Sequence, residues 1–232
     1  MKQNSKILPP PPKVDGHILP LDVVIPRLFD SPKIIGLTGD VSSAKSNFLY
    51  AIIDNLINKY GFSHSNLYTY ALPVFVGETK IYSVEELEQI ENSVIILDEF
   101  YLFLDLENRK QKKNLGEMMQ RIKHSNNVLI LSGLPHNFNK FVSSQCEVKI
   151  YKQTTLKNLI NGSPMKDTAL AYSGIEKAST VLFIPHNRAL VYGVNGHGDP
   201  KEKNHWTVTS VDHMTQYDVK LSLPPILPEP IK

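Results

Sequence analysis

The sequence of 232 residues has few of the features that build a disulfide-linked, zinc-stabilised or membrane-spanning fold. Cys146 is the only cysteine, so neither an internal disulfide nor a cysteine-based zinc site can form. No apolar run approaches the roughly 18 residues that a membrane helix requires, and the N-terminus lacks the apolar stretch of a secretory signal. A lone cysteine fits a reducing compartment. We therefore expect a cytoplasmic protein without a membrane partner.

Arginine is also scarce. Only Arg27, Arg109, Arg121 and Arg188 are present, although the chain has 25 basic residues and a net charge of +2. The basic residues are unevenly placed, since residues 109–123 hold six of them against a single acid, Glu117, and the rest of the chain is slightly acidic. With 41% hydrophobic and 21% charged residues, the composition is that of a folded domain. A chain of this length can bury a core that is stable without disulfides or a structural metal.

Proline clusters mark the two ends, which predicts a proline-rich arm over residues 1–16 and a proline-rich tail over 216–232. Between them, apolar strand patterns alternate with helical periodicity, which predicts an α/β core over 17–178 with a mostly parallel central sheet covered by helices on both faces. A β-hairpin extension over 179–215 is expected to pack on this core. The predicted strands cover 34–37, 67–72, 94–97, 128–131, 147–151, 181–184 and 189–192, and the predicted helices cover 45–60, 84–91 and 109–124.

The first chemical motif lies between the strand at 34–37 and the helix at 45–60. It matches the phosphate-loop pattern G-x-x-x-x-G-K-[ST], except that Ala44 replaces the second glycine. Backbone N–H groups of such a loop and of the helix N-terminus bind phosphate oxygens, Lys45 reaches the β- and γ-phosphates, and Ser46 offers its hydroxyl to Mg²⁺. The motif predicts a site for ATP and Mg²⁺, made of Gly39, Asp40, Val41, Ser42, Ser43, Ala44, Lys45, Ser46 and Asn47.

The second motif is an acidic pair at the end of the apolar run at 94–97. Asp98 and Glu99 follow a strand that is expected to be buried on both faces, so they face the ligand crevice at the carboxyl edge of the sheet. Asp98 is expected to hold Mg²⁺ through a water molecule, and Glu99 to polarise the attacking water. The 53 positions between Lys45 and Asp98 leave room for a strand inserted between the two motif strands.

Together these motifs resemble the additional-strand, catalytic-glutamate class of RecA-like P-loop ATPases. Gly39-Asp40 with Ala44-Lys45-Ser46, and Asp98-Glu99-Phe100, are similar to the GDxxxAKS and DEF motifs of minichromosome-maintenance helicases. The order of elements over roughly 30–155 resembles the FtsK–HerA group, which includes viral genome-packaging ATPases. That resemblance implies a catalytic Arg121 in the helix after the acidic pair and a polar sensor, Ser132, at the end of the next strand, with His136 or Asn137 as substitutes.

The resemblance also implies partners. Motors of this class form homo-oligomeric rings in which one subunit supplies an arginine to its neighbour's nucleotide, and Arg121 ranks before Arg109 and Arg188 for this role. The basic segment 109–124 is expected to contact phosphate, either of the DNA backbone or of a neighbouring subunit's nucleotide. A virion or replication partner is a further expectation, and the location is the host cytoplasm if the protein is viral.

The leading hypothesis is therefore ATP hydrolysis coupled to DNA translocation, in the packaging of a viral or plasmid genome. A helicase or replication-initiation AAA+ ATPase is the first alternative. The second is a nucleotide-dependent assembly or binding protein with little turnover, which Ala44 and Ser132 would favour. The acidic pair, and the absence of an arginine-rich lid in the sequence, argue against a small-molecule kinase.

Overall fold

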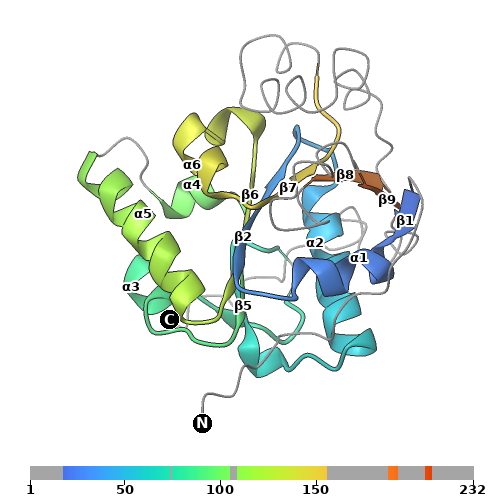
Figure 1. Cartoon of the computed structure of the whole chain (residues 1–232), viewed down its shortest axis with the longest axis horizontal. Helices are drawn as coiled ribbons and strands as arrows, with labels where there is room; N and C mark the ends of the chain where they lie inside the picture. The colour runs from blue at the N-terminus through green and yellow to red at the C-terminus, as the bar shows by residue number, and fades with distance from the viewer. Residues whose placement is uncertain (1–17, 74, 105–108, 156–187, 193–206, 211–232) are drawn as a thin grey trace, which may run out of the picture.

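A nine-stranded sheet forms the centre of the computed structural model, which describes residues 18–73, 75–104, 109–155, 188–192 and 207–210 (Figure 1). The strands are β1 (Ile18–Pro20), β2 (Lys33–Thr38), β3 (Leu67–Tyr70), β4 (Thr79–Lys80), β5 (Val94–Leu97), β6 (Val128–Gly133), β7 (Val148–Tyr151), β8 (Arg188–Tyr192) and β9 (Thr207–Ser210). The α-helices are α1 (Leu21–Leu28), α2 (Lys45–Asp54), α3 (Val84–Leu87), α4 (Phe100–Phe103), α5 (Arg109–His124) and α6 (Lys140–Gln145).

Six neighbouring strands of the sheet are parallel, in the order β7-β2-β6-β5-β3-β4. Strand β8 joins β7 antiparallel and β9 joins β8 antiparallel, while β1 pairs parallel with β9 at the edge. This arrangement confirms the predicted α/β class with a mostly parallel central sheet. The carboxyl ends of the six parallel strands all lie along one edge of the sheet, and this is where the two sequence motifs fall.

Helices cover the sheet on both sides, as predicted (Figure 1). On one face α1 and α2 pack against alternate strand residues such as Ile35 and Ile96, and on the other α3, α4, α5 and α6 pack against the residues between them, such as Ile95 and Leu97. Every residue of β5 is buried because side chains from both faces are covered. None of the described helices is long and apolar enough to cross a bilayer.

The strand between the two motif strands is not the one that the sequence spacing suggested. The strand in the gap between Lys45 and Asp98 is β3, and it lies on the outer side of β5. The inserted strand is β6, which follows β5 in the chain and pairs with both β2 and β5. Strand order is a property of tertiary pairing, and spacing along the chain does not determine it.

Other boundaries differ from the predictions in small ways. Helix α3 ends at Leu87 instead of about residue 91. Its N-cap Ser83 accepts a hydrogen bond from the Glu86 N–H (3.4 Å), and the Glu86 carboxylate accepts one from the Tyr82 N–H. The helix predicted over 45–60 continues from α2 as a π-helical turn (Asn55–Lys59), and Gly61 follows with φ 66°. The short elements β1, α1, β4, α4, α6 and β9 were not predicted.

The extension and the proline-rich ends are only partly described. Strand β8 confirms the predicted strand at 189–192. Its predicted hairpin partner at 181–184, the arm 1–16 and the tail 216–232 lie outside the described residues, so the domain boundaries stay predictions.

Candidate functional site

The loop between β2 and α2 has the curled form that the phosphate-loop pattern predicts. The Lys45 ammonium turns back into the loop, where it donates hydrogen bonds to the carbonyl oxygens of Gly39 (3.1 Å) and Asp40 (3.0 Å). Burial lowers the pKa of Lys45, and the carboxylates of Glu99, Asp98 and Asp40 oppose that effect. The charge of Lys45 is therefore held at the centre of the loop, close to the acidic pair.

Ala44 adopts the geometry for which this position normally has glycine. Its φ of 62° and ψ of 38° lie in the left-handed region, as does the φ of Ser42 at 64°. The conformation costs an alanine roughly 1–2 kcal/mol relative to a right-handed one. The loop keeps its shape in spite of this cost, and the first N–H groups of the ten-residue helix α2 face the hollow of the loop, where an anion can bind.

The acidic pair meets the loop at the carboxyl edge of the sheet. The Ser46 hydroxyl donates a hydrogen bond to Oδ2 of Asp98 at 2.7 Å, although 52 positions separate them. The other carboxylate oxygen of Asp98 accepts the Glu99 N–H at 3.2 Å, and the Asp98 N–H donates to the Tyr70 carbonyl. The Asp98 carboxylate is buried and held in place from two sides. The structure thus brings together the two halves of the predicted site.

Glu99 has an unusual backbone conformation, with a φ of 49°. The pKa of its carboxyl group is raised, mainly by burial and also by the charge of Asp98. The charge of Lys45, a hydrogen bond with Tyr101 and the charge of His136 oppose this rise. The Oε2 atom of Glu99 is buried and has no hydrogen-bond partner among the described residues. The side chain is therefore a carboxylate with one free acceptor next to Lys45.

Other polar atoms at the same edge share this property. Among the residues that the structure describes, the buried oxygens Ser43 Oγ, Asn47 Oδ1 and Ser132 Oγ have no hydrogen-bond partner. Ser132 pairs with Leu37 of β2 at the end of β6, between the two motif strands. Buried polar atoms are rarely left unpaired in a native protein, so several of them around one loop point to a bound polar ligand.

The segment that follows β6 also reaches the site. His136 contributes to the charge environment of Glu99, and the Asn137 side-chain nitrogen is buried without a partner among the described residues. The short 3-10 turn that holds both residues, η3 (Pro135–Asn137), comes directly after the strand that carries Ser132. All three polar side chains considered for the sensor role are therefore close to the acidic pair or to its neighbouring strand end.

The sequence analysis missed a second lysine at the loop. Lys152, directly after β7, is fully buried, and its backbone N–H donates to the Thr38 carbonyl at 2.7 Å. Its ammonium lies 5.5 Å from the centre of the Phe48 ring in α2. The signal in the sequence was a lysine at the end of a predicted strand, but nothing in the sequence shows that β7 lies beside β2.

Arg121, in contrast, is not brought to the site of its own chain. It lies in the last turn of α5, which leads into the amino end of β6, whereas the phosphate loop follows the carboxyl end of β2 (Figure 1). Its guanidinium pairs with Glu88 (2.8 Å) and Glu117 (3.9 Å), and all three side chains are exposed. Any contact between Arg121 and a nucleotide has to involve another subunit.

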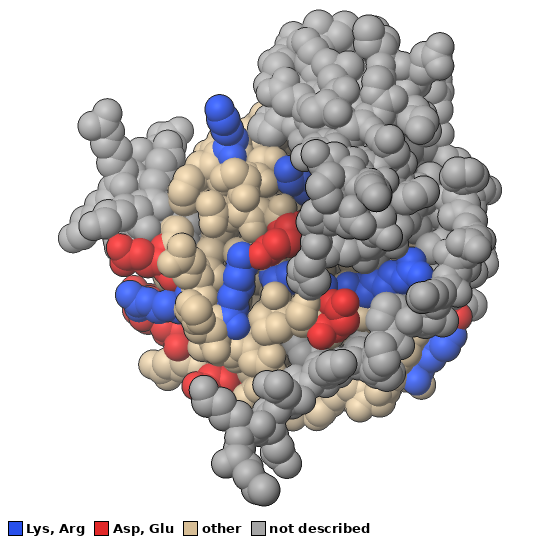
Figure 2. Space-filling view, in the orientation of Figure 1, with Lys and Arg blue, Asp and Glu red and all other residues tan. Residues whose placement is uncertain are grey.

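The basic segment forms the predicted helix α5, but the side chains of residues 109–115 lie outside what the structure describes. In the part of the surface that is described in Figure 2, basic and acidic side chains are interspersed. A DNA-binding role for this segment stays a prediction.

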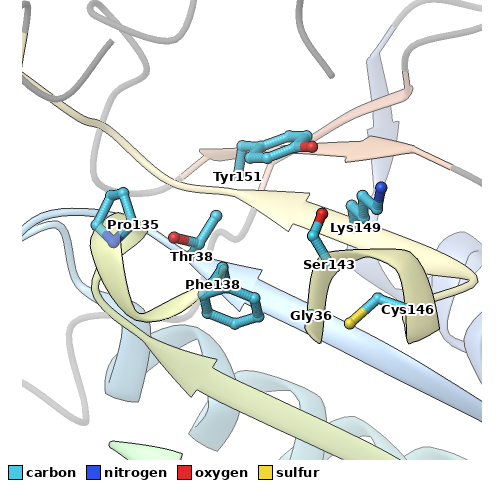
Figure 3. Close-up of a pocket in the computed structure, with 8 residues that line it drawn as sticks. All are labelled: Gly36, Thr38, Pro135, Phe138, Ser143, Cys146, Lys149 and Tyr151. Carbon is cyan, nitrogen blue, oxygen red and sulfur yellow. The ribbon is translucent and has the colours of Figure 1, made fainter. Parts of the chain in front are cut away.

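A separate pocket lies on the opposite face of β2 from α2 (Figure 3). Thr38 and Gly36 of β2 form its floor with Lys149 and Tyr151 of β7, and the segment from Pro135 to Cys146 closes it. Burial raises the pKa of the Cys146 thiol to about 12, so this cysteine is an unreactive part of the wall. None of the residues from Gly39 to Asn47 lines this pocket, which therefore differs from the phosphate site.

The residues at the loop suit a magnesium ion that is shared with phosphate. No group of three or more His, Cys, Asp or Glu side chains in the described ranges could hold a metal by itself. Ser46 and Asp98 offer two hard oxygen ligands side by side. Magnesium typically binds to one or two carboxylates together with substrate phosphates. These oxygens fit Mg²⁺ when a nucleotide completes the site.

The comparison with solved structures agrees with this geometry. The genome packaging NTPase B204 of Sulfolobus turreted icosahedral virus 2, in complex with sulfate, superposes with a TM-score of 0.52 and 18% identity over 71% of this chain and 92% of B204. Its complex with AMPPCP superposes with a TM-score of 0.52 and 16% identity, over 71% of this chain and 93% of B204. B204 of Sulfolobus turreted icosahedral virus, a DNA-packaging ATPase, gives 0.51 at 16% identity, with 71% and 94% covered.

The chain has the RecA-like P-loop NTPase fold. This likeness at 16–18% identity concerns the fold alone. No protein-family model and no curated protein sequence matches the chain.

Proposed function

We propose that the protein hydrolyses ATP and couples hydrolysis to DNA translocation, in the packaging of a viral or plasmid genome. One observation carries the nucleotide part of the proposal: the hydrogen bond between Ser46 and Asp98 joins the phosphate loop to the acidic pair. The packaging part is supported by the solved structures that share the fold, which are described as packaging NTPases. The inserted strand β6 is the arrangement expected of the additional-strand ATPase class.

Each residue at the loop has a distinct role in this proposal. The loop N–H groups bind the phosphate oxygens, and Lys45 neutralises charge on the β- and γ-phosphates. Ser46 and Asp98 hold Mg²⁺, which supplies further neutralisation of phosphate charge when bound. Glu99 orients the attacking water with its free Oε2 and accepts its proton. The raised pKa of Glu99 makes its carboxylate a stronger base than an exposed glutamate.

The remaining parts of the proposal involve partners. Ser132 senses the γ-phosphate from the end of β6, with His136 or Asn137 as substitutes. Subunits assemble into a homo-oligomeric ring in which Arg121 reaches the neighbour's nucleotide, and residues 109–124 contact the DNA backbone. A ring agrees with the position of Arg121, which lies at the opposite end of the sheet from its own loop.

The test is phosphate release from ATP by the full chain, with and without double- and single-stranded DNA. Wild type should hydrolyse ATP, and DNA should stimulate turnover. We expect Lys45→Ala to abolish nucleotide binding and Glu99→Gln to retain binding but lower turnover by roughly 10²–10⁴-fold, since it loses the water-activating base. Lys149→Ala is the matched lysine control, because Lys149 faces the separate pocket. A wild type that hydrolyses no ATP with any DNA present contradicts the motor function.

A nucleotide-dependent assembly protein with little turnover is the second candidate. The pairing of Arg121 with Glu88 favours it to a small extent, because this exposed pair, worth at most about 1 kcal/mol, holds the arginine in its own chain until a neighbour displaces it. Tight ATP binding with negligible hydrolysis, unaffected by Glu99→Gln, would support this candidate over a motor.

A further inference from the structure

Tyr101 is a hydrogen-bond partner of Glu99 to which the proposed mechanism gives no role. Its phenolic hydroxyl and the Glu99 carboxylate form a side-chain hydrogen bond. An ionised carboxylate only accepts, so the Tyr101 O–H is the donor. The Oε2 atom of Glu99 has no partner among the described residues, so the hydroxyl bonds to Oε1. One carboxylate oxygen of Glu99 is therefore held, and the other is free.

A tight turn holds the backbone between these two side chains. Glu99 has a φ of 49° and a ψ of 48°, in the left-handed region, and α4 begins at the next residue. The Leu102 N–H donates to the Glu99 carbonyl at 2.9 Å and closes the turn. A glutamate keeps such a conformation only where the surrounding structure imposes it. The turn therefore fixes Tyr101 relative to Glu99.

Helix α4 is anchored in the core by two aromatic rings. Phe100 is fully buried and meets the Phe138 ring edge to face, with 4.9 Å between the ring centres. Phe103 lies on the same face of the helix, three positions later, and meets Tyr70 of β3 in the same way at 4.8 Å. These contacts set the rotation of α4. Tyr101 lies away from the two anchors, partly exposed, with its hydroxyl on the Glu99 carboxylate.

An oriented carboxylate is what the activation of a water molecule requires. The terminal torsion of a glutamate side chain is broad unless a contact fixes it. A general base acts only when its oxygen is within hydrogen-bond reach of the proton that it accepts. The charge of Lys45 attracts Glu99, but an ammonium group acts as a point charge. The bond from Tyr101 is directional, so it can fix where Oε2 points.

We propose that Tyr101 is a positioning residue, which orients Glu99 through Oε1 and leaves Oε2 for the attacking water. This inference rests on the proposed function, in which Glu99 activates that water. In this role Tyr101 touches neither the nucleotide nor the reacting atoms, so its whole effect on the rate passes through Glu99. Loss of the hydroxyl should therefore lower turnover, leave nucleotide binding intact and have no effect once Glu99 is replaced.

The experiment is single-turnover hydrolysis of radiolabelled ATP by the full chain, together with calorimetric titration of ADP. Tyr101→Phe removes only the hydroxyl and keeps the ring, so α4 should stay packed. We expect it to lower the rate roughly ten- to a hundred-fold, because a small misplacement of a reacting group costs up to about that factor. The affinity for ADP should stay within about two-fold of wild type. Tyr82→Phe is the matched control and should change neither value, because Tyr82 is an exposed tyrosine that precedes α3.

A double-mutant cycle separates positioning from a merely structural effect. In the Glu99→Gln background, Tyr101→Phe should change the residual rate by no more than about two-fold, because no base is left to orient. An equal loss of rate in both backgrounds would show that Tyr101 acts without Glu99, and would overturn the proposal. A loss of ADP affinity that matches the loss of rate would overturn it as well.

Failure of the proposed function gives a different result. If wild type hydrolyses no ATP, or if Glu99→Gln is as fast as wild type, the proposed function itself fails. If Glu99→Gln is slow but Tyr101→Phe hydrolyses ATP at the wild-type rate or faster, only the role of Tyr101 is overturned. Tyr101→Leu also lacks the hydroxyl and should behave as Tyr101→Phe does, so the test does not depend on one variant. Thermal melting shows which variants are folded.

Discussion

Individual residues at the phosphate loop adopt conformations and environments that are costly in isolation. Ala44 and Glu99 have positive φ values, and Lys152 is an ammonium without access to water. Such costs persist only where the surrounding structure imposes them, and they gather at functional sites. Among the described non-glycine residues with positive φ, Ser42, Ala44 and Glu99 lie at the loop and at the acidic pair, and Ala71 directly follows β3. The other two are asparagines, Asn92 and Asn126, which adopt this conformation more readily.

At this scale the burial of Lys152 predicts how stability depends on pH. Its pKa is about 7 in the folded chain and near 10.5 when exposed, so between these values the unfolded chain binds more protons. The free energy of unfolding should therefore rise with pH, by about 2 kcal/mol from pH 7 to pH 9 for the nucleotide-free protein. Urea unfolding at several pH values measures this.

A control variant tests that prediction, and a second buried group limits its pH range. Lys152→Met should flatten the rise and stabilise the nucleotide-free protein at pH 7, because an apolar side chain has no charge to desolvate. Above about pH 10 the trend reverses, because the unfolded lysine then loses its proton while the buried Cys146 thiol keeps its own to about pH 12 and the unfolded thiol does not. Equal pH dependence of wild type and Lys152→Met between pH 7 and 9 would contradict the prediction.

Among the elements, the arrangement of β2, β6 and β7 positions the site. Strand β6 places Ser132 between the two motif strands, and β7 delivers the segment 152–155 to the back of the loop. The loop is therefore held on one side by the acidic pair after β5 and on the other by the exit of β7. Neither support is adjacent to the loop in the sequence.

The close packing of the loop against that exit can be tested at Gly39. A Cβ there would lie 2.5 Å from Ser43 Oγ and 2.6 Å from Lys152 Cβ. Gly39→Ala should destabilise the protein by about 1–3 kcal/mol through overpacking, and weaken ADP binding, as measured by urea unfolding and calorimetry. Gly116→Ala in α5 is the control, since its Cβ would meet only the Phe141 ring, at 3.3 Å. Wild-type stability and binding in Gly39→Ala would show that the segment does not pack on the loop.

On the scale of the whole molecule, the question is how copies of the chain complete one another. Arg121 forms an exposed pair with Glu88, and pairs of this kind are worth at most about 1 kcal/mol. The pair can therefore open at little cost when another subunit offers a nucleotide. Catalysis that depends on such an exchange would occur only in the assembled protein.

Assembly should therefore depend on nucleotide, and activity on mixed subunits. We expect the mass in solution to rise when a non-hydrolysable ATP analogue is added, as measured by light scattering. Arg121→Ala should lower turnover by roughly 10³-fold or more without changing ADP affinity. Mixing Arg121→Ala with Lys45→Ala subunits should restore part of the activity, because each variant supplies what the other lacks.

Glu88→Gln separates the catalytic role from the surface pair. It breaks the contact but keeps the arginine, so turnover should be retained or increased. Full turnover by Arg121→Ala alone would exclude this arginine as the residue that is supplied to a neighbour's nucleotide. The same experiment would then be carried out on Arg109 and Arg188.

The sequence by itself determined the α/β class and the positions of the buried strands, and it predicted roles for Lys45, Ser46, Asp98 and Glu99. These follow from local rules, because strand periodicity and the phosphate-loop pattern involve residues close together in the chain. Only the tertiary structure decided which strand lies between the motif strands, that Lys152 stands behind the loop, and that Arg121 points away from it. These depend on which strands pair, and pairing is set by packing between segments that are distant in the sequence, up to 113 positions for β2 and β7.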